Sequence, residues 1–126
     1  MSTAYLDSSC VVAAAFGEPG ARPMIARRRS FALVVSSTLL EAEVFSALHR
    51  EQRAITDAFH AELSLIAPDR ALSEEIARVL EAGYVRGADC WHLATALYVA
   101  PEPSDLTFLT LDLAQRKVAK ALGFQV

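Results

Sequence analysis

Hydrophobic and polar residues follow two spacings along the chain, one typical of strands and one of helices. Short apolar runs at Thr3–Leu6 and Phe31–Val35 predict strands, the second of them buried on both faces. Between Leu39 and Arg50 apolar residues recur every three or four positions, which predicts an amphipathic helix. A helix is also expected over Cys10–Phe16, with Ser8 or Ser9 as its N-cap.

The rest of the chain continues this alternation of strands and helices. Further strands are expected at Leu63–Ala67, Leu106–Leu111 and Phe124–Val126, and further helices at Pro23–Arg29, Ser73–Ala82, Asp89–Ala100 and Leu113–Leu122, with a short helical stretch starting at Thr56 and Asp57. Such alternation predicts a parallel sheet with helices on both faces, a three-layer α/β/α sandwich. Residues 1–126 are expected to form a single domain, because no repeat, linker or low-complexity tract divides them.

Composition narrows the class of protein. Hydrophobic residues make up 53% of the chain and charged residues 21%, which excludes a disordered chain. No apolar run approaches the roughly 20 residues of a membrane helix, and the N-terminus lacks the basic start of a signal peptide, so a cytoplasmic protein is expected. The only cysteines, Cys10 and Cys90, stand outside any metal-binding motif and are expected to be buried and reduced.

Acidic residues follow two predicted strands at the point where each strand ends. Asp7 comes directly after Leu6, and Asp112 directly after Leu111. The carboxyl ends of parallel strands form one edge of the sheet, and ligands of open α/β sheets bind there. Asp7 alone is equally well explained as a partner of the following helix N-terminus, but two acids at corresponding strand ends indicate a shared site.

Further acids lie near the starts of two predicted helices. Asp89 lies in the first turn of its helix, where the helix dipole alone accounts for a negative charge. Glu41 and Glu43 flank the apolar stripe of their helix symmetrically, so periodicity does not choose between them. Either glutamate is also typical of a solvated residue at the boundary of such a stripe.

Bringing these acids together in one site would cost free energy, because their negative charges repel. Carboxylates within about 4 Å of one another repel by on the order of 1 to 4 kcal/mol per pair, so the site needs a cation. Ligation by oxygen alone favours Mg²⁺ or Mn²⁺ over Zn²⁺. The matching chemistry is metal-assisted hydrolysis of a phosphodiester bond.

The charge distribution allows a nucleic-acid substrate. The net charge of −3 argues against one when taken alone. If four acids are neutralised by metal, however, the rest of the chain is slightly positive. Its cations are also clustered, at Arg27–Arg29, at Arg50 and Arg53, and at Arg116, Lys117 and Lys120. Such patches are able to hold a phosphate backbone.

Four segments resemble, in order, the motifs of the PIN-domain family, and of its VapC-like toxin ribonucleases in particular. They are Tyr5-Leu6-Asp7-Ser8-Ser9, Ser37 to Leu48, Gly87 to Ala96 and Phe108 to Asp112, and Leu122-Gly123-Phe124 resembles the family's ending. The third is similar to a pattern commonly written D-A-x-H-L-A-T-A. Each motif alone is weak, but four in this order over nearly the whole chain are specific.

The resemblance implies a roughly five-stranded sheet of order 3-2-1-4-5 and a site. The implied catalytic and metal-binding residues are Asp7, Glu43, Asp89 and Asp112, with Thr110, Ser8 and Arg116 as supporting residues. Glu43 is favoured over Glu41 because, like the family acid, it precedes a hydrophobic pair and an alanine four residues on.

The resemblance also implies an activity and partners. The expected activity is hydrolysis of RNA with Mg²⁺ or Mn²⁺, leaving a 5′-phosphate and a 3′-hydroxyl. The expected role is the toxin of a type II toxin–antitoxin system, as a homodimer whose acidic groove is covered by a VapB-like antitoxin. The RNA target is not encoded in any local motif.

Several residues near the motifs have a structural interpretation instead. His92 shares a helix face with Asp89 and is expected to be packed or hydrogen-bonded rather than to act as a base. Trp91 and Tyr98 are expected in packing rather than in stacking on RNA bases. Cys90 and Trp91 replace the smaller family residues, and the segment from Glu51 to Leu63 is short for the family's helix pair.

Two other functions remain open. One is a catalytically inert PIN-like module that binds RNA or protein. The other is a different acidic-site α/β phosphotransfer protein. A haloacid-dehalogenase-type phosphatase needs a second Asp two positions after the first, where Ser9 stands, and a receiver domain needs adjacent acids early in the chain and a lysine after its last strand.

Overall fold

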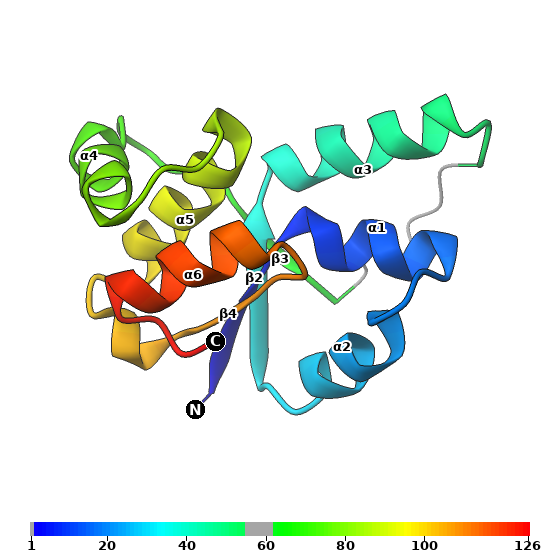
Figure 1. Cartoon of the computed structure of the whole chain (residues 1–126), viewed down its shortest axis with the longest axis horizontal. Helices are drawn as coiled ribbons and strands as arrows, with labels where there is room; N and C mark the ends of the chain where they lie inside the picture. Colours follow the sequence, from blue (N-terminus) through cyan, green and yellow to red (C-terminus); the bar gives the residue numbers. More distant parts are fainter. Residues whose placement is uncertain (1, 55–61) are drawn as a thin grey trace.

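A parallel sheet forms the centre of the molecule (Figure 1). The computed structural model describes residues 2–54 and 62–126. In these residues the strands pair in the order β3-β2-β1-β4, and every pairing is parallel. The four strands are β1 (Thr3–Leu6), β2 (Leu33–Ser37), β3 (Ser64–Ile66) and β4 (Thr107–Leu109). In the register, Tyr5 of β1 lies opposite Val35 of β2 and Phe108 of β4.

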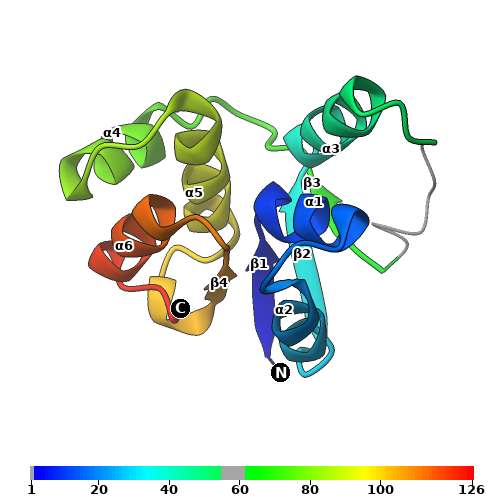
Figure 2. The same ribbon diagram turned by 45° about the vertical axis from the view of Figure 1, so that its right-hand side comes forward.

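Helices cover both faces of this sheet, as the alternation of strands and helices predicts. Figure 2 shows α1 (Ser8–Phe16), α2 (Ala21–Arg28) and α3 (Leu39–Arg50) on one side and α4 (Ser73–Ala82), α5 (Gly87–Val99) and α6 (Leu113–Leu122) on the other. A short 3₁₀ helix, η2 (Pro103–Asp105), precedes β4. The three-layer α/β/α sandwich expected from the sequence is therefore confirmed.

The core has two apolar layers, one on each side of the sheet. Successive side chains of a strand point to opposite faces, so Ala4 and Leu6 of β1 pack on one side and Tyr5 on the other. The layer containing Leu6 includes Leu40 of α3, and the layer containing Tyr5 includes Leu93 of α5. Polar residues, and not these two apolar layers, occupy the carboxyl edge of the sheet.

Apolar spacing and capping residues predicted most helix boundaries correctly. The bounds of α3, α4 and α6 are those expected, and Gly123 ends α6 with a φ of 104°, in the left-handed region that favours glycine. The expected serine N-cap of α1 is wrong, because the Asp7 carboxylate accepts the hydrogen bond from the backbone N–H of Ser9. Helix α2 begins at Ala21, before the expected Pro23.

The expected fifth strand is also wrong. The segment Phe124–Val126 forms only one isolated parallel bridge, between Gln125 and Thr107 of β4. Gln125 exchanges two backbone hydrogen bonds with Leu106 and Phe108, and the buried ring of Phe124 lies 5.9 Å from that of Phe108, so the segment lies beside β4 without forming a strand of its own. Among the described residues the sheet therefore has four strands, in the order 3-2-1-4.

Two further expectations concern segments rather than the sheet. The helical stretch expected at Thr56 and Asp57 lies outside the described residues. None of the described helices combines the length and the apolar character needed to cross a bilayer.

Candidate active site

The buried carboxylate of Asp7 lies at the carboxyl edge of the sheet, between β1 and α1. Asp7 is only 2% exposed, yet its carboxylate accepts hydrogen bonds from two protein N–H groups. The Ser9 backbone N–H lies 3.0 Å from Oδ2, and the Gln115 amide nitrogen Nε2 lies 3.1 Å from Oδ1. The Thr110 hydroxyl is 3.4 Å from Oδ2. The two N–H donors offset the cost of burying the charge and fix the orientation of the carboxylate.

The wholly buried side chain of Gln115 connects three parts of this edge. Its Oε1 accepts a hydrogen bond from the Thr110 hydroxyl at 2.7 Å, while its Nε2 donates to Asp7 and, at 3.4 Å, to the backbone carbonyl of Asp89. A buried amide that is satisfied at both ends tolerates little movement. Gln115 therefore ties the end of β1 to the start of α5.

Asp112 caps the next helix at the same edge. Its Oδ1 accepts the backbone N–H of Gln115 at 2.9 Å, which makes it the N-cap of α6. Its own backbone N–H donates to the Thr110 hydroxyl oxygen at 3.0 Å. Thr110 is thus bonded to both strand-end segments, since the Ser9 hydroxyl also lies 3.2 Å from it.

The pKa of Asp89 responds to burial and to the charges of the other three acids. It lies half-buried in the first turn of α5. Burial raises its pKa, and the negative charges of Asp7, Asp112 and Glu43 raise it further, while His92 opposes them. Carboxylates affect each other's pKa in this way only when they are close. The four acids expected from the sequence are therefore drawn from β1, α3, α5 and α6 into one electrostatic neighbourhood.

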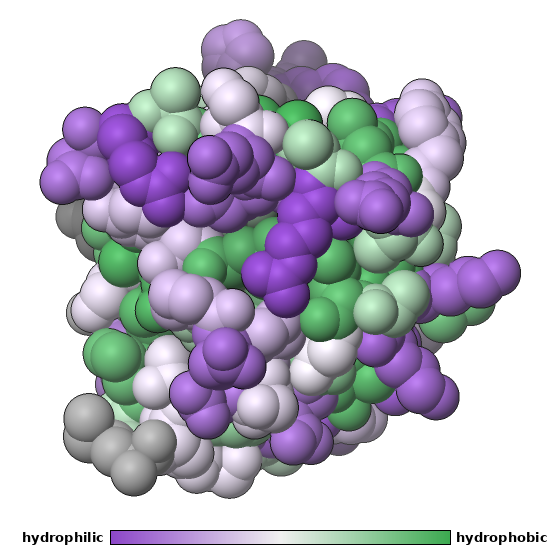
Figure 3. Space-filling view, turned by 90° about the vertical axis from the view of Figure 1, so that its left-hand side faces the viewer, coloured by the Kyte–Doolittle hydropathy of each residue, from purple (hydrophilic) through white to green (hydrophobic). Residues whose placement is uncertain are grey.

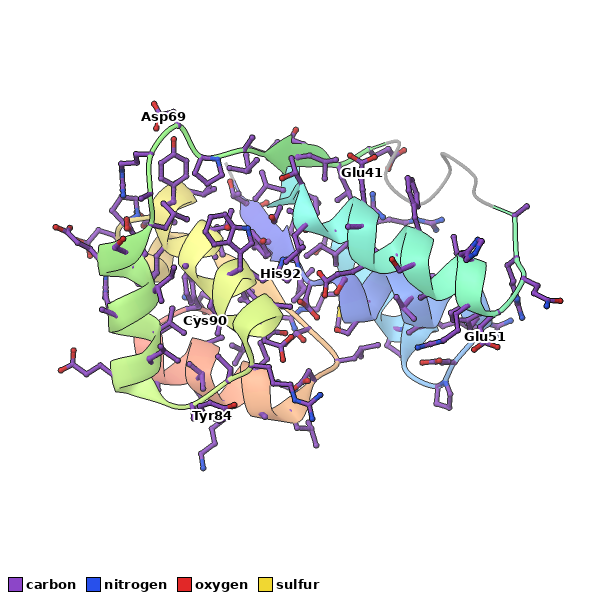
Figure 4. All side chains as sticks on the ribbon, turned by 90° about the horizontal axis from the view of Figure 1, so that it is seen from above. Glu41, Glu51, Asp69, Tyr84, Cys90 and His92 are labelled. Carbon is purple, nitrogen blue, oxygen red and sulfur yellow. The ribbon has the colours of Figure 1, made fainter. Side chains whose placement is uncertain are left out.

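Glu43 enters this neighbourhood through His92. The imidazole is wholly buried, and its Nε2 lies 2.5 Å from Oε1 of Glu43 and 3.8 Å from Oδ1 of Asp7. The Glu43 side chain is 26% exposed, so part of it still faces solvent. Seen from above, Glu41 lies on the other side of α3 from His92 (Figure 4). Of the two glutamates that periodicity left equivalent, Glu43 is the one beside the other acids.

The remaining candidates occupy the margins of the site. Ser8 is buried at the start of α1, and the polar contacts next to it are made by Ser9, whose hydroxyl accepts the backbone N–H of Leu111 at 3.1 Å. Arg116 is exposed on α6, one turn after Asp112. Both residues flank the acids, because Ser9 next to Ser8 and Asp112 one turn before Arg116 belong to the hydrogen-bonded network.

The aromatic residues near the third motif are engaged within the chain. The indole N–H of Trp91 donates to the Ser37 hydroxyl at 3.0 Å. The Tyr98 hydroxyl donates to Asp69 at 3.0 Å, and the guanidinium of Arg70 lies 5.2 Å from the centre of its ring. These contacts agree with packing roles and not with exposed platforms for RNA bases.

The cysteines are free, buried thiols, as the sequence predicts. Burial raises the pKa of Cys10 to about 12, with a further contribution from the charge of Asp7. Burial also raises the pKa of Cys90. Thiols with raised pKa values carry almost no thiolate at neutral pH, so neither is suited to act as a nucleophile.

The donor set fits a hard divalent cation by charge and by atom type. Four carboxylates offer only oxygen ligands, and the raised pKa of Asp89 marks negative charge that the protein does not offset. The side chains are not arranged as a finished metal site, because no three His, Cys, Asp or Glu residues within 2–54 and 62–126 have that arrangement. Asp7, Glu43 and Asp112 are each held by protein donors instead.

Sequence reasoning missed the residues that hold the acids. Gln115, Ser9 and Tyr5 make direct or relayed contacts with them, but none was a candidate. A signal existed for Gln115, because Asp112 and Gln115 have the spacing of a capping box. In that motif the amide would return to the N-cap backbone, whereas here it points across the site to Asp7.

Comparison with known proteins identifies the family. The family model for the PIN domain matches residues 4–121, which is nearly the whole chain. Neither the curated proteins nor the solved structures include a significant match. PIN domains are generally metal-dependent nucleases, and the sheet order and the acids at its carboxyl edge agree with that fold. The chain belongs to the PIN domain family.

Proposed function

We propose that this protein is a metal-dependent endoribonuclease whose Mg²⁺ or Mn²⁺ is held by Asp7, Glu43, Asp89 and Asp112. The observation that carries the proposal concerns Asp89, whose pKa is raised by burial and then by the charges of Asp7, Asp112 and Glu43. Such uncompensated charge at one edge of a sheet costs free energy unless a cation binds there. Membership of a family that usually uses divalent metals supports the same conclusion.

Each residue has a distinct part in this proposal. Bound divalent ions supply Lewis-acid chemistry and neutralise charge on the phosphate that is cleaved. Asp7 is the fixed ligand, because Gln115 and the Ser9 N–H hold its carboxylate. Asp89 is the ligand whose pKa burial and the other three acids raise, so a cation beside it would relieve an unfavourable charge. Glu43 and Asp112 complete the set. One oxygen of each carboxylate contacts the protein, Oε1 of Glu43 at His92 and Oδ1 of Asp112 at the Gln115 N–H, and the other oxygen is proposed to face the ion.

RNA is the proposed substrate because basic side chains flank the acids. Arg116 is exposed one turn after Asp112, and Lys117 and Lys120 follow on the same helix. Arg86 precedes the first turn of α5, close in sequence to Asp89. Cations on both sides of an acidic centre attract a phosphate backbone, while bound metal removes the repulsion between acids and phosphate. Hydrolysis is proposed to leave a 5′-phosphate and a 3′-hydroxyl.

The proposed biological role is that of a cytoplasmic VapC-like toxin, paired with a VapB-like antitoxin that covers the acidic groove. The support is the order and spacing of the four sequence motifs. A homodimer is proposed as the working unit. The face that carries α4 supports it, because hydrophobic side chains reach the surface there between hydrophilic ones (Figure 3). Leu80 is 46% exposed, and Tyr84, just after α4, is 83% exposed.

One observation favours an inert binding module as the second candidate. Protein donors already hold three of the acids, and the described residues contain no ready arrangement for a metal. In such a module the polar network would serve stability alone. The two candidates differ in whether the acids bind metal and cleave RNA.

The test is cleavage of a mixed RNA substrate in Mg²⁺ or Mn²⁺. The wild type should cleave RNA, and Asp7→Asn and Asp89→Asn should each reduce the rate by at least about 100-fold, as loss of a ligand requires. Asp105→Asn, which makes the same change in η2 away from the acids, is the matched control and should cleave normally. Cleavage that persists in both site variants would contradict the proposal.

A further inference from the structure

His92 is the one side chain of α5 that links the core to the acids. It is 0% exposed, and both ring nitrogens have a partner. Nδ1 lies 2.7 Å from the Tyr5 hydroxyl of β1, and Nε2 lies 2.5 Å from Oε1 of Glu43 on α3. Figure 4 shows His92 between α5 and α3. Three elements therefore meet in one hydrogen-bonded chain.

The contact with Glu43 places a proton on one nitrogen of the imidazole. A carboxylate offers only lone pairs, so its contact with Nε2 requires a proton on that nitrogen. At Nδ1 the roles depend on whether that nitrogen also carries a proton: a bare Nδ1 accepts the Tyr5 proton, and a protonated Nδ1 donates to the Tyr5 oxygen. Both ring nitrogens are then satisfied, and the proton on Nε2 points at Glu43.

Tyr5 is a rigid anchor for this chain. Its ring stacks on Phe108 with centroids 5.2 Å apart and planes 6° apart. The same ring meets the imidazole edge-on, at 5.7 Å and 73°. The orientation of His92 is consequently set by packing in the core as well as by the hydrogen bond.

Without the hydrogen bond to His92, the Glu43 side chain would be expected to turn away from the other acids. Its side chain is partly exposed on a surface helix, and the charges of Asp7 and Asp89 repel it. A long, flexible carboxylate in that position would turn toward water. His92 Nε2 also lies 3.8 Å from Asp7, so it holds Glu43 beside the most firmly fixed acid.

We infer that His92, oriented by Tyr5, is a positioning residue that holds the Glu43 carboxylate in place to bind the divalent cation. The inference rests on the proposed function for the identity of the ligand, but the proton arrangement that it requires exists without metal. Outer partners of metal ligands orient them, and their loss commonly weakens metal binding by about 10- to 100-fold.

The proton arrangement is measured in the metal-free protein, by the ¹⁵N chemical shifts of the His92 ring. Nε2 should be protonated and bonded to an acceptor. Tyr5→Phe keeps the ring that stacks on Phe108 and removes only the hydroxyl, so it should change the Nδ1 shift. Tyr98→Phe removes a hydroxyl that is bonded to Asp69 instead, and should leave the His92 shifts unchanged. An unprotonated Nε2 in the wild type would overturn the inference.

Positioning is measured by titration with Mn²⁺ alone. His92→Leu should weaken binding by about 10- to 100-fold. His92→Gln should recover part of the loss, because its amide nitrogen replaces Nε2 as a donor to Glu43. Tyr5→Phe should weaken binding several-fold and guards against a His92→Leu protein that does not fold. His49→Gln, an exposed histidine change on α3, is the control and should bind as the wild type does.

The two measurements distinguish a failure of the positioning role of His92 from a failure of the proposed function. Wild-type affinity in Tyr5→Phe and in folded His92→Leu would overturn the positioning role. Absence of Mn²⁺ binding by the wild type would contradict the proposed function, and the ring shifts would still show whether His92 donates to Glu43.

Discussion

Helices α3 and α5 both contribute to the acidic edge, but they bury different kinds of side chain. The buried residues of α3 are aliphatic, namely Leu40, Val44 and Leu48, and Glu41 and Glu43 lie on the two sides of this apolar stripe. Helix α5 buries residues around most of its circumference, and these include His92 and Thr95. The layer beneath α3 thus supplies apolar burial, whereas the layer beneath α5 also carries the polar groups that orient the acids.

This difference has a physical consequence for the site. Apolar contacts are non-directional, so they hold α3 against the sheet without fixing the direction of Glu43. Hydrogen bonds are directional, and those of His92 and Gln115 reach Glu43 and Asp7 from the α5 and α6 side. Stability and orientation should therefore respond separately to mutations in the two layers.

The largest effect is expected on stability, from Leu40→Ala in the apolar layer. Leu40 is 0% exposed, and removing its side chain leaves a cavity, so the free energy of unfolding should fall by about 2 to 5 kcal/mol. Urea unfolding measures the loss, and Mn²⁺ affinity of the folded protein should not change. Leu113→Ala, at a residue 80% exposed, should alter stability by less than about 0.5 kcal/mol. Equal losses in the two variants would contradict this assignment of the core.

The next effect is expected on activity, from the two glutamates of α3. Glu43→Gln should reduce RNA cleavage by about 100-fold, because a charged ligand is replaced by a neutral amide. Glu41→Gln makes the same change on the other side of the helix and should leave the rate within about 2-fold. The ratio of the two rates measures how sharply the site is confined to one face of α3. If Glu41→Gln is the more damaging change, the wrong glutamate has been assigned to the site.

A smaller effect is expected from Gln115→Leu, in the polar network. The change removes the partner of Thr110 and a donor to Asp7, so it should cost about 1 to 3 kcal/mol of stability. Mn²⁺ binding should also weaken, by about 10-fold. Gln125→Leu, at an exposed residue, is the matched control for both readings. Normal Mn²⁺ affinity in a folded Gln115→Leu protein would show that Asp7 needs no support from α6.

The smallest effect is expected from Asp89→Asn in the metal-free protein. The pKa of Asp89 is raised above 3.8 in the folded state, so folding penalises its charged form. That penalty is fully present above the folded pKa, shrinks as the pH falls through it and disappears below the unfolded value of 3.8. Asp89→Asn should therefore raise the free energy of unfolding at pH 7, and the gain should vanish in acid. Unfolding with a chelator present measures it, and a loss of stability at pH 7 would contradict the pKa direction.

The sequence predicted what depends on local pattern. The bounds of α3, α4 and α6 followed from apolar spacing and capping residues that lie within each helix. Asp7 and Asp112 could be placed at one edge because parallel strands share their carboxyl ends. The Glu41 and Glu43 alternatives were separated only by resemblance, since both flank the same stripe.

Contacts between distant segments were not predictable in the same way. Tyr5 and His92 are 87 positions apart, and Asp7 and Gln115 are 108 apart, so no local pattern pairs them. His92 was expected to be packed or hydrogen-bonded, and it is both, but its partners depend on how α5 lies against β1 and α3. The fifth strand could not be predicted for the same reason, because the pairing of Phe124–Val126 with β4, limited to one bridge at Gln125, is a contact between distant segments.

The claim on which the account depends is that the acids of β1, α3, α5 and α6 bind one cation site together. Calorimetric titration with Mn²⁺ tests it directly, in the wild type and in Asp7→Asn, Glu43→Gln, Asp89→Asn and Asp112→Asn. The account predicts binding by the wild type and a loss of at least about 10-fold in each variant, with Glu41→Gln and Asp105→Asn unchanged. No binding by the wild type at millimolar Mn²⁺ would contradict it.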